Sequence, residues 1–157
     1  MVREYGTDVR CVRCGTPAGG EVTGVIPRFM VEQGWHHTGL TQLVEVESMH
    51  ERKKTMADLS NAIIALPGGC GTLEELLEII TWKQLGLYLN PIVNTELSRL
   101  FRPLLDMLRQ AVDENFMRTQ HGAIWHVAQT TAGSRGTDIY HSLVGGPPLP
   151  LIRCNYE

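Results

Sequence analysis

The sequence lacks the features that mark membrane, secreted and nucleic-acid-binding proteins. No apolar run in its 157 residues approaches the roughly 20 residues that a helix needs to cross a bilayer. Its first ten residues, MVREYGTDVR, contain no apolar segment of the signal-peptide kind. Positive charge is not in excess, because the formal net charge is -3, so no global field attracts DNA or RNA. We therefore predict a cytoplasmic protein without a membrane or nucleic acid partner.

Cysteine and metal-ligand patterns are also sparse. Cys11 and Cys14 form a C-x-x-C pair, but a zinc site usually needs a second pair at close spacing, and the other two cysteines are isolated. A thioredoxin-like redox pair would need an adjoining strand and helix, which this segment does not suggest. His36 and His37 have no carboxylate–histidine spacing beside them. We expect free thiols in a reducing compartment and no bound metal.

What is present is an alternation of strand and helix patterns. Short apolar or alternating runs predict strands, and amphipathic runs between them predict helices, which together favour an α/β fold with a parallel sheet. The length suits one domain over 1–157, with an irregular start (1–18), a core (19–132) and a loose tail (133–157). The predicted strands are 21–27, 43–47, 61–67, 90–94 and 123–128, and the predicted helices are 48–60, 73–85 and 101–116.

The most informative stretch is LPGGCGTLEE, residues 66–75, between an apolar strand and an amphipathic helix. A helix N-terminus offers unpaired N–H groups and a partial positive charge, and glycines let an anion approach the backbone. The loop is neither a Walker A loop nor a G-x-G-x-x-G loop. Two simpler interpretations stay open: a tight corner, or a capping box formed by Thr72 and Glu75. The candidate phosphate cradle consists of Pro67, Gly68, Gly69, Cys70, Gly71 and Thr72.

Two further groups of charges suggest what the cradle could hold. Glu74 and Glu75 place carboxylates beside a phosphate, which is unfavourable unless they contact a ribose or assist bond cleavage. Upstream, MHERKK (49–54) supplies cations, of which Lys54 fits a solvated helix face and Arg52 could reach the same sheet edge. A phosphate, a ribose and a carboxylate suggest N-glycosidic cleavage through an oxocarbenium-like state, in which a carboxylate stabilises the sugar or activates water.

The pairing of MHERKKTM with ALPGGCGTLEELLEIITWKQLG resembles the LOG family of cytokinin-activating phosphoribohydrolases. The resemblance is good over 19–91 and weaker to Met117. It implies a Rossmann-like fold, a homodimer, and hydrolysis of N6-modified adenosine 5'-monophosphates to free base and ribose 5-phosphate. It also implies no metal, no cofactor and no decarboxylation, and no lysine here is marked as a pyridoxal Schiff-base residue.

The resemblance also assigns roles to individual residues. Arg52 and Glu75 match the family's catalytic pair, and Met49 would lie near the base. The remaining substrate-contacting positions would be Lys53, the cradle residues Gly68, Gly69, Cys70, Gly71 and Thr72, then Leu73 and Glu74, and finally Thr81.

One departure from the family pattern affects the expected activity. RCVRCGTP lies almost directly against AGGEVTGVIP, as if the family's start were joined to its middle without the strands and the glycine-rich loop between them. A βαβ unit needs roughly 30 residues, so none fits there. We therefore expect a retained nucleotide 5'-monophosphate site with impaired activity. The alternatives are a nucleotide-binding protein without turnover and a dimer partner of a full-length relative.

Overall fold

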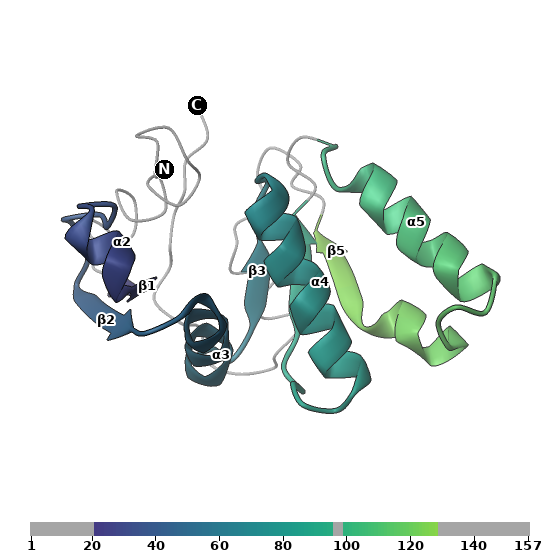
Figure 1. Ribbon diagram of the computed structural model, residues 1–157. Coiled ribbons are helices and arrows are strands. Elements are labelled where there is room, and N and C mark those ends of the chain that lie inside the picture. The colour runs from purple at the N-terminus through teal and green to yellow at the C-terminus, as the bar shows by residue number, and fades with distance from the viewer. Residues whose placement is uncertain (1–20, 96–98, 129–157) are drawn as a thin grey trace. The chain divides into compact units, whose positions relative to one another are not determined.

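The computed structural model describes residues 21–95 and 99–128 of the chain. The chain divides into two compact units, residues 1–59 with 135–157 and residues 60–134, and each described part contains its own parallel sheet (Figure 1). All the paired strands are parallel, and helices connect them, so the predicted α/β fold is confirmed. The union of both units in one domain stays a prediction, and the predicted irregular start and loose tail lie outside the described residues.

The first unit pairs two strands. Strand β1 runs in register with β2, from Thr23 opposite Gln42 to Pro27 opposite Val46. Gly24 packs closely against the residue that precedes the return to β2, because a β-carbon at position 24 would lie 2.6 Å from Cδ1 of Leu40 and would displace that side chain. The elements are β1 (Thr23–Pro27), α2 (Arg28–Glu32), β2 (Gln42–Val46) and α3 (Met49–Leu59).

The start of α3 follows the predicted capping pattern. The N–H of Glu51 donates to Oγ of Ser48 at 3.1 Å, as the Ser48-x-x-Glu51 spacing predicts. The carboxylate of Glu51 accepts the N–H of Glu47 at 2.8 Å, one residue before the position that a strict capping box would use. The helix start is therefore confirmed, and the returning bond is shifted by one residue.

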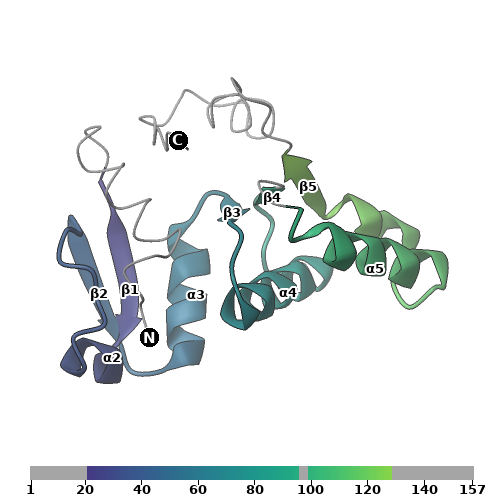
Figure 2. The same ribbon diagram turned by 90° about the horizontal axis from the view of Figure 1, so that it is seen from above.

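The second unit has three parallel strands in the order β3-β4-β5. Helices α4 and α5 lie on the same face of this sheet (Figures 1 and 2). This is expected, because both connections between parallel strands are right-handed and both move in the same direction across the sheet. The elements are β3 (Ile63–Ala65), α4 (Cys70–Gln84), β4 (Ile92–Thr95), α5 (Arg102–Asp113), the 3-10 helix η1 (Thr119–Ala123) and β5 (Trp125–Ala128).

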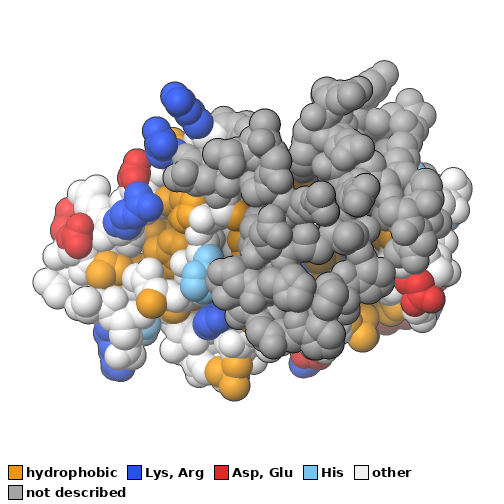
Figure 3. All heavy atoms as spheres, turned by 180° about the vertical axis from the view of Figure 1, so that it is seen from behind, with side chains coloured by type: hydrophobic (Ala, Val, Ile, Leu, Met, Phe, Trp, Pro, Cys, Tyr) orange, Lys and Arg blue, Asp and Glu red, His pale blue; other side chains and the backbone are white. Residues whose placement is uncertain are grey.

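The two faces of this sheet differ in burial. Ile92 and Asn94 share one face and are fully buried. On the other face Ile64 is 51% exposed and His126 is exposed, whereas Val93, which pairs with both, is 2% exposed. Figure 3 shows the molecule from behind, with hydrophobic side chains at its surface. Strand β3 is therefore much less buried at Ile64 than at Ala65, which is 7% exposed.

Helix α4 packs through a narrower stripe than the sequence predicts. The predicted stripe is Leu73, Leu76, Leu77 and Ile80, whereas the buried residues are Leu76, Ile79 and Ile80. Leu77 is 36% exposed. The buried side is centred on Leu76, and at 3.6 residues per turn Leu77 lies about 100° round from it, beyond the contact. Among the helices of the described residues, none has the length and apolar content that a membrane crossing needs.

Candidate active site

The glycine loop connects β3 to α4 within the second unit. Gly69 is the N-cap of α4, with an extended backbone (φ -84°, ψ -157°), and its carbonyl accepts the N–H of Leu73 at 3.1 Å. In the described structure no side chain caps this helix start. Its first N–H groups, together with the positive end of the helix dipole, form a surface that suits an anion.

The three glycines of the loop differ in what surrounds them. A β-carbon at Gly68 would overlap Oγ1 of Thr72 and lie 2.9 Å from its Cβ, so packing within the loop requires glycine there. A β-carbon at Gly69 or Gly71 would meet nothing within 4 Å. Neither of these two has a positive φ, so backbone conformation does not require glycine at either position. The space beside Gly69 and Gly71 is therefore open to a group from outside the loop.

The start of α4 excludes one of the simpler interpretations of the sequence. A capping box would place Thr72 at the N-cap and Glu75 three residues into the helix. Since α4 begins at Cys70, Thr72 is its third residue and Glu75 its sixth. The capping-box interpretation is therefore wrong, and Glu75 needs another explanation.

The other candidate residues of α4 differ in solvent exposure and in position along the helix axis. Glu74 is exposed, Leu73 and Glu75 are half-buried, and Cys70 is an exposed free cysteine. Thr81 lies about 16 Å along the helix from Cys70 at 1.5 Å per residue, and its hydroxyl donates to the carbonyl of Leu77 at 2.8 Å. The structure therefore gathers residues 68–75 at the helix start and leaves Thr81 near the opposite end.

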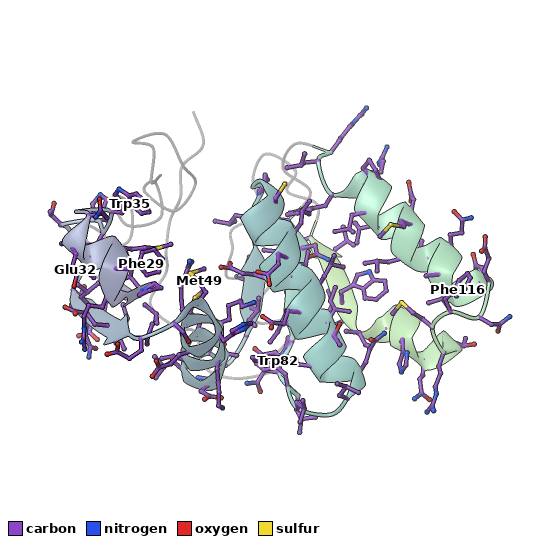
Figure 4. All side chains as sticks on the ribbon, in the orientation of Figure 1. Phe29, Glu32, Trp35, Met49, Trp82 and Phe116 are labelled. Atoms are coloured by element: carbon purple, nitrogen blue, oxygen red, sulfur yellow. The ribbon has the colours of Figure 1, made fainter. Side chains whose placement is uncertain are left out.

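The remaining candidates belong to the first unit. Met49 is the first residue of α3 and is 36% exposed (Figure 4), while Arg52 and Lys53 are half-buried and the Nε atom of Arg52 is buried. Lys54 forms a 2.8 Å ion pair with Asp58 on an exposed face, as a solvated residue should. Because Arg52 and Glu75 lie in different units, their pairing stays a prediction.

Two polar residues at the end of β4 were not singled out from the sequence. Thr95 is 6% exposed, and its hydroxyl donates to the carbonyl of Ala65 at 2.9 Å. Asn94 is fully buried, and its Nδ2 and Oδ1 have no hydrogen-bond partner in the described part of the chain. The available signal was the change from apolar to polar residues in IVNT, at the carboxyl end of a buried strand.

The histidines and the C-x-x-C pair add no ligand set to the described structure. Nδ1 of His37 accepts the N–H of Gly39 at 2.9 Å. Within residues 21–95 and 99–128, no group of three or more His, Cys, Asp or Glu side chains could hold a metal ion. Cys11 and Cys14 lie outside these residues, so the metal-free state stays a prediction.

Comparison with known proteins places the chain in a family. The family model described as "possible lysine decarboxylase" matches residues 11–134. The chain belongs to this family, which includes the LOG proteins. The glycine loop, α4 and the basic start of α3 all fall inside the matched region, so the resemblance inferred from PGGCGTLEE and MHERKK is confirmed.

Three relatives of this LOG-family chain carry the same functional name, cytokinin riboside 5'-monophosphate phosphoribohydrolase. One from Rhodococcoides fascians is 46% identical over 102 residues, covering 64% of this chain and 51% of the relative. One from Arabidopsis thaliana is 43% identical over 101 residues, covering 64% and 44%. One from Oryza sativa subsp. japonica is 42% identical over 99 residues, covering 63% and 41%. The chain thus spans about half the length of the curated relatives it matches.

Proposed function

We propose that the chain hydrolyses the N-glycosidic bond of cytokinin riboside 5'-monophosphates, giving the free base and ribose 5-phosphate. The observation that carries the proposal is the start of α4, where no side chain of the described structure caps the helix and the space beside Gly69 and Gly71 is open. A 5'-phosphate suits this position because it accepts hydrogen bonds from the helix N–H groups and complements the dipole. The names of the relatives support the same substrate class.

The carboxylates that follow supply the chemistry in this proposal. Glu75 is the sixth residue of α4, about 8 Å along the axis from Cys70. A ribose whose phosphate lies at the helix start would extend over this side chain. Cleavage builds positive charge on the sugar, which a carboxylate stabilises, and the same group can accept a proton from the attacking water. In this proposal Arg52 orients the carboxylate or holds the phosphate, and Lys53 and Met49 contact the phosphate and the base.

The test is release of free base from N6-isopentenyladenosine 5'-monophosphate by the purified chain, followed by chromatography. Glu75→Gln keeps the size of the side chain and removes its charge, so we expect at least a hundredfold loss of rate. Glu78→Gln is the matched control, because it neutralises another half-buried carboxylate one turn further along α4 and should retain most activity. Binding of AMP without release of base would overturn the hydrolase and favour the nucleotide-binding alternative.

The proposal also covers assembly and location. The homodimer with shared sites follows from the family resemblance, and the cytoplasmic location follows from the sequence features described above. Sedimentation at several protein concentrations tests the homodimer. A monomer that still releases base would remove the dimer from the proposal and leave the reaction.

A further inference from the structure

The strongest feature that the proposed reaction does not use is the side chain of Asn94. It is fully buried at the next-to-last position of β4, directly opposite Ala65 of β3. A carboxamide carries two donor hydrogens and an acceptor oxygen, and buried groups of this kind are nearly always hydrogen-bonded. Neither polar atom of Asn94 has a partner in the described part of the chain.

The direction of this side chain follows from the sheet. Residues two apart on a strand share a face, so Asn94 lies with Ile92, whose side chain is also fully buried. The opposite face is buried at Val93 but exposed at Ile64 and His126. Helices α4 and α5 therefore cover the face of Ile92 and Asn94 (Figure 2). Asn94 thus points to the helix side of the sheet.

The position along the strand places Asn94 near the glycine loop. Its partner Ala65 is the last residue of β3, and five residues later the chain enters α4 at Cys70. The start of α4 and the end of β4 therefore lie at the same edge of the sheet. Thr95, the next residue, already reaches across to β3 through its bond to the carbonyl of Ala65.

We propose that Asn94 is a positioning residue for the phosphate cradle. When an anion binds at the start of α4, the carboxamide of Asn94 forms hydrogen bonds to the backbone of residues 66–69 and holds the N–H groups of the helix start toward the anion. The inference rests on the proposed nucleotide site. It explains why a polar side chain without a hydrogen-bond partner in the described residues occupies a fully buried position. A buried polar residue that served only the ligand-free fold would have a hydrogen-bond partner in that fold, as Thr95 has.

The two neighbours provide a matched test in the full chain. Asn94→Leu keeps the number and branching of the side-chain heavy atoms and removes the carboxamide, and Thr95→Val keeps the shape and removes the hydroxyl. Thermal unfolding by circular dichroism and calorimetric titration with AMP and with inorganic phosphate are measured for both. We expect Asn94→Leu to melt at or above the wild-type temperature and to bind AMP at least tenfold more weakly. We expect Thr95→Val to melt lower and to bind AMP within twofold of wild type.

The outcomes separate this inference from the proposed function. If the wild type binds AMP and Asn94→Leu binds equally well, the positioning role is wrong and the nucleotide site stands. A fall in the melting temperature of ligand-free Asn94→Leu like that of Thr95→Val would also overturn it, and Asn94→Ala repeats the test if leucine prevents folding. If the wild type binds AMP without releasing base, the reaction fails while the role of Asn94 stands. If the wild type binds neither AMP nor phosphate, both proposals fail.

Discussion

The two units of the chain are built from the same kinds of element but differ in how much apolar surface they bury. Among the described residues, every buried hydrophobic side chain except Pro27, Val46 and Ala57 belongs to the second unit. In the described residues, the first unit has a two-stranded sheet, and the second has three strands with two helices on one face. Because burial of apolar area is the main stabilising term, the described part of the second unit should be the more stable of the two.

The two units also carry different residues of the candidate active site. The second unit carries the uncapped start of α4 and the carboxylates that follow it. The first unit carries Arg52 and Lys53 on α3, a helix in which Ala57 is the one buried residue. The proposed phosphate site and the proposed cations therefore belong to units whose described parts bury different amounts of apolar surface.

Core substitutions should give the largest difference between the units. Phe101 is 1% exposed in the second unit, so Phe101→Ala should cost about 3–5 kcal/mol. Val46 is 5% exposed in the first unit, and Val46→Ala should cost about 2 kcal/mol. Hydrogen–deuterium exchange read peptide by peptide should show faster exchange in β3, β4 and β5 for the first variant and in β1 and β2 for the second. Uniform acceleration along the whole chain in both variants would show that the two units unfold together.

The glycine loop offers a smaller and more local contrast. Gly68→Ala would force the overlap with Thr72 described above and should cost about 1–3 kcal/mol. Gly69→Ala meets nothing within 4 Å and should change stability by about 0.5 kcal/mol or less. If the open space holds a phosphate, the second variant should still lose AMP affinity, because its methyl group occupies that space. Denaturation in urea and titration with AMP measure the two effects, and unchanged AMP affinity in Gly69→Ala would place the ligand elsewhere.

Much of the fold could be predicted from the sequence because local patterns and tertiary packing agree. The run of apolar residues in NAIIALP and the capping pattern at Ser48 set β3 and the start of α3 within a few residues. The start of α4 was predicted three residues late, because Cys70 and Gly71 are weak helix formers that the first turn nevertheless includes. The 3-10 helix η1 was missed, since TQHGA has no apolar periodicity.

The candidate site was predictable only where one continuous stretch carries it. Residues 68–75 form a loop and a helix start that the glycine pattern predicts directly. Asn94 is close to that loop because it pairs with Ala65, which lies 29 positions earlier in the sequence, so no local pattern connects them. The exposure of Ile64 was unpredictable for the same reason, because it depends on which face distant helices cover. Long-range placement, and not the chemistry of single residues, limited the prediction.

The smallest expected effect concerns Lys83 at the end of α4, which stabilises the turn leading to β4. Its Nζ donates to the carbonyl of Asn90 at 2.6 Å, and desolvation by burial lowers the pKa of its ammonium group below the ordinary value of 10.5. Between the folded-state pKa and 10.5 the unfolded chain binds more protons, so stability should rise with pH in that window. The slope of the free energy of unfolding against pH should be a fraction of the roughly 1.4 kcal/mol per pH unit that one proton gives.

Urea denaturation between pH 9 and 11, in steps of about half a pH unit, measures this rise in stability. The substitution Lys83→Met should remove the rise and lower stability at all these pH values. An equal slope in the variant would assign the rise to other groups, and the contribution of Lys83 to the second unit would then be its hydrogen bonds alone.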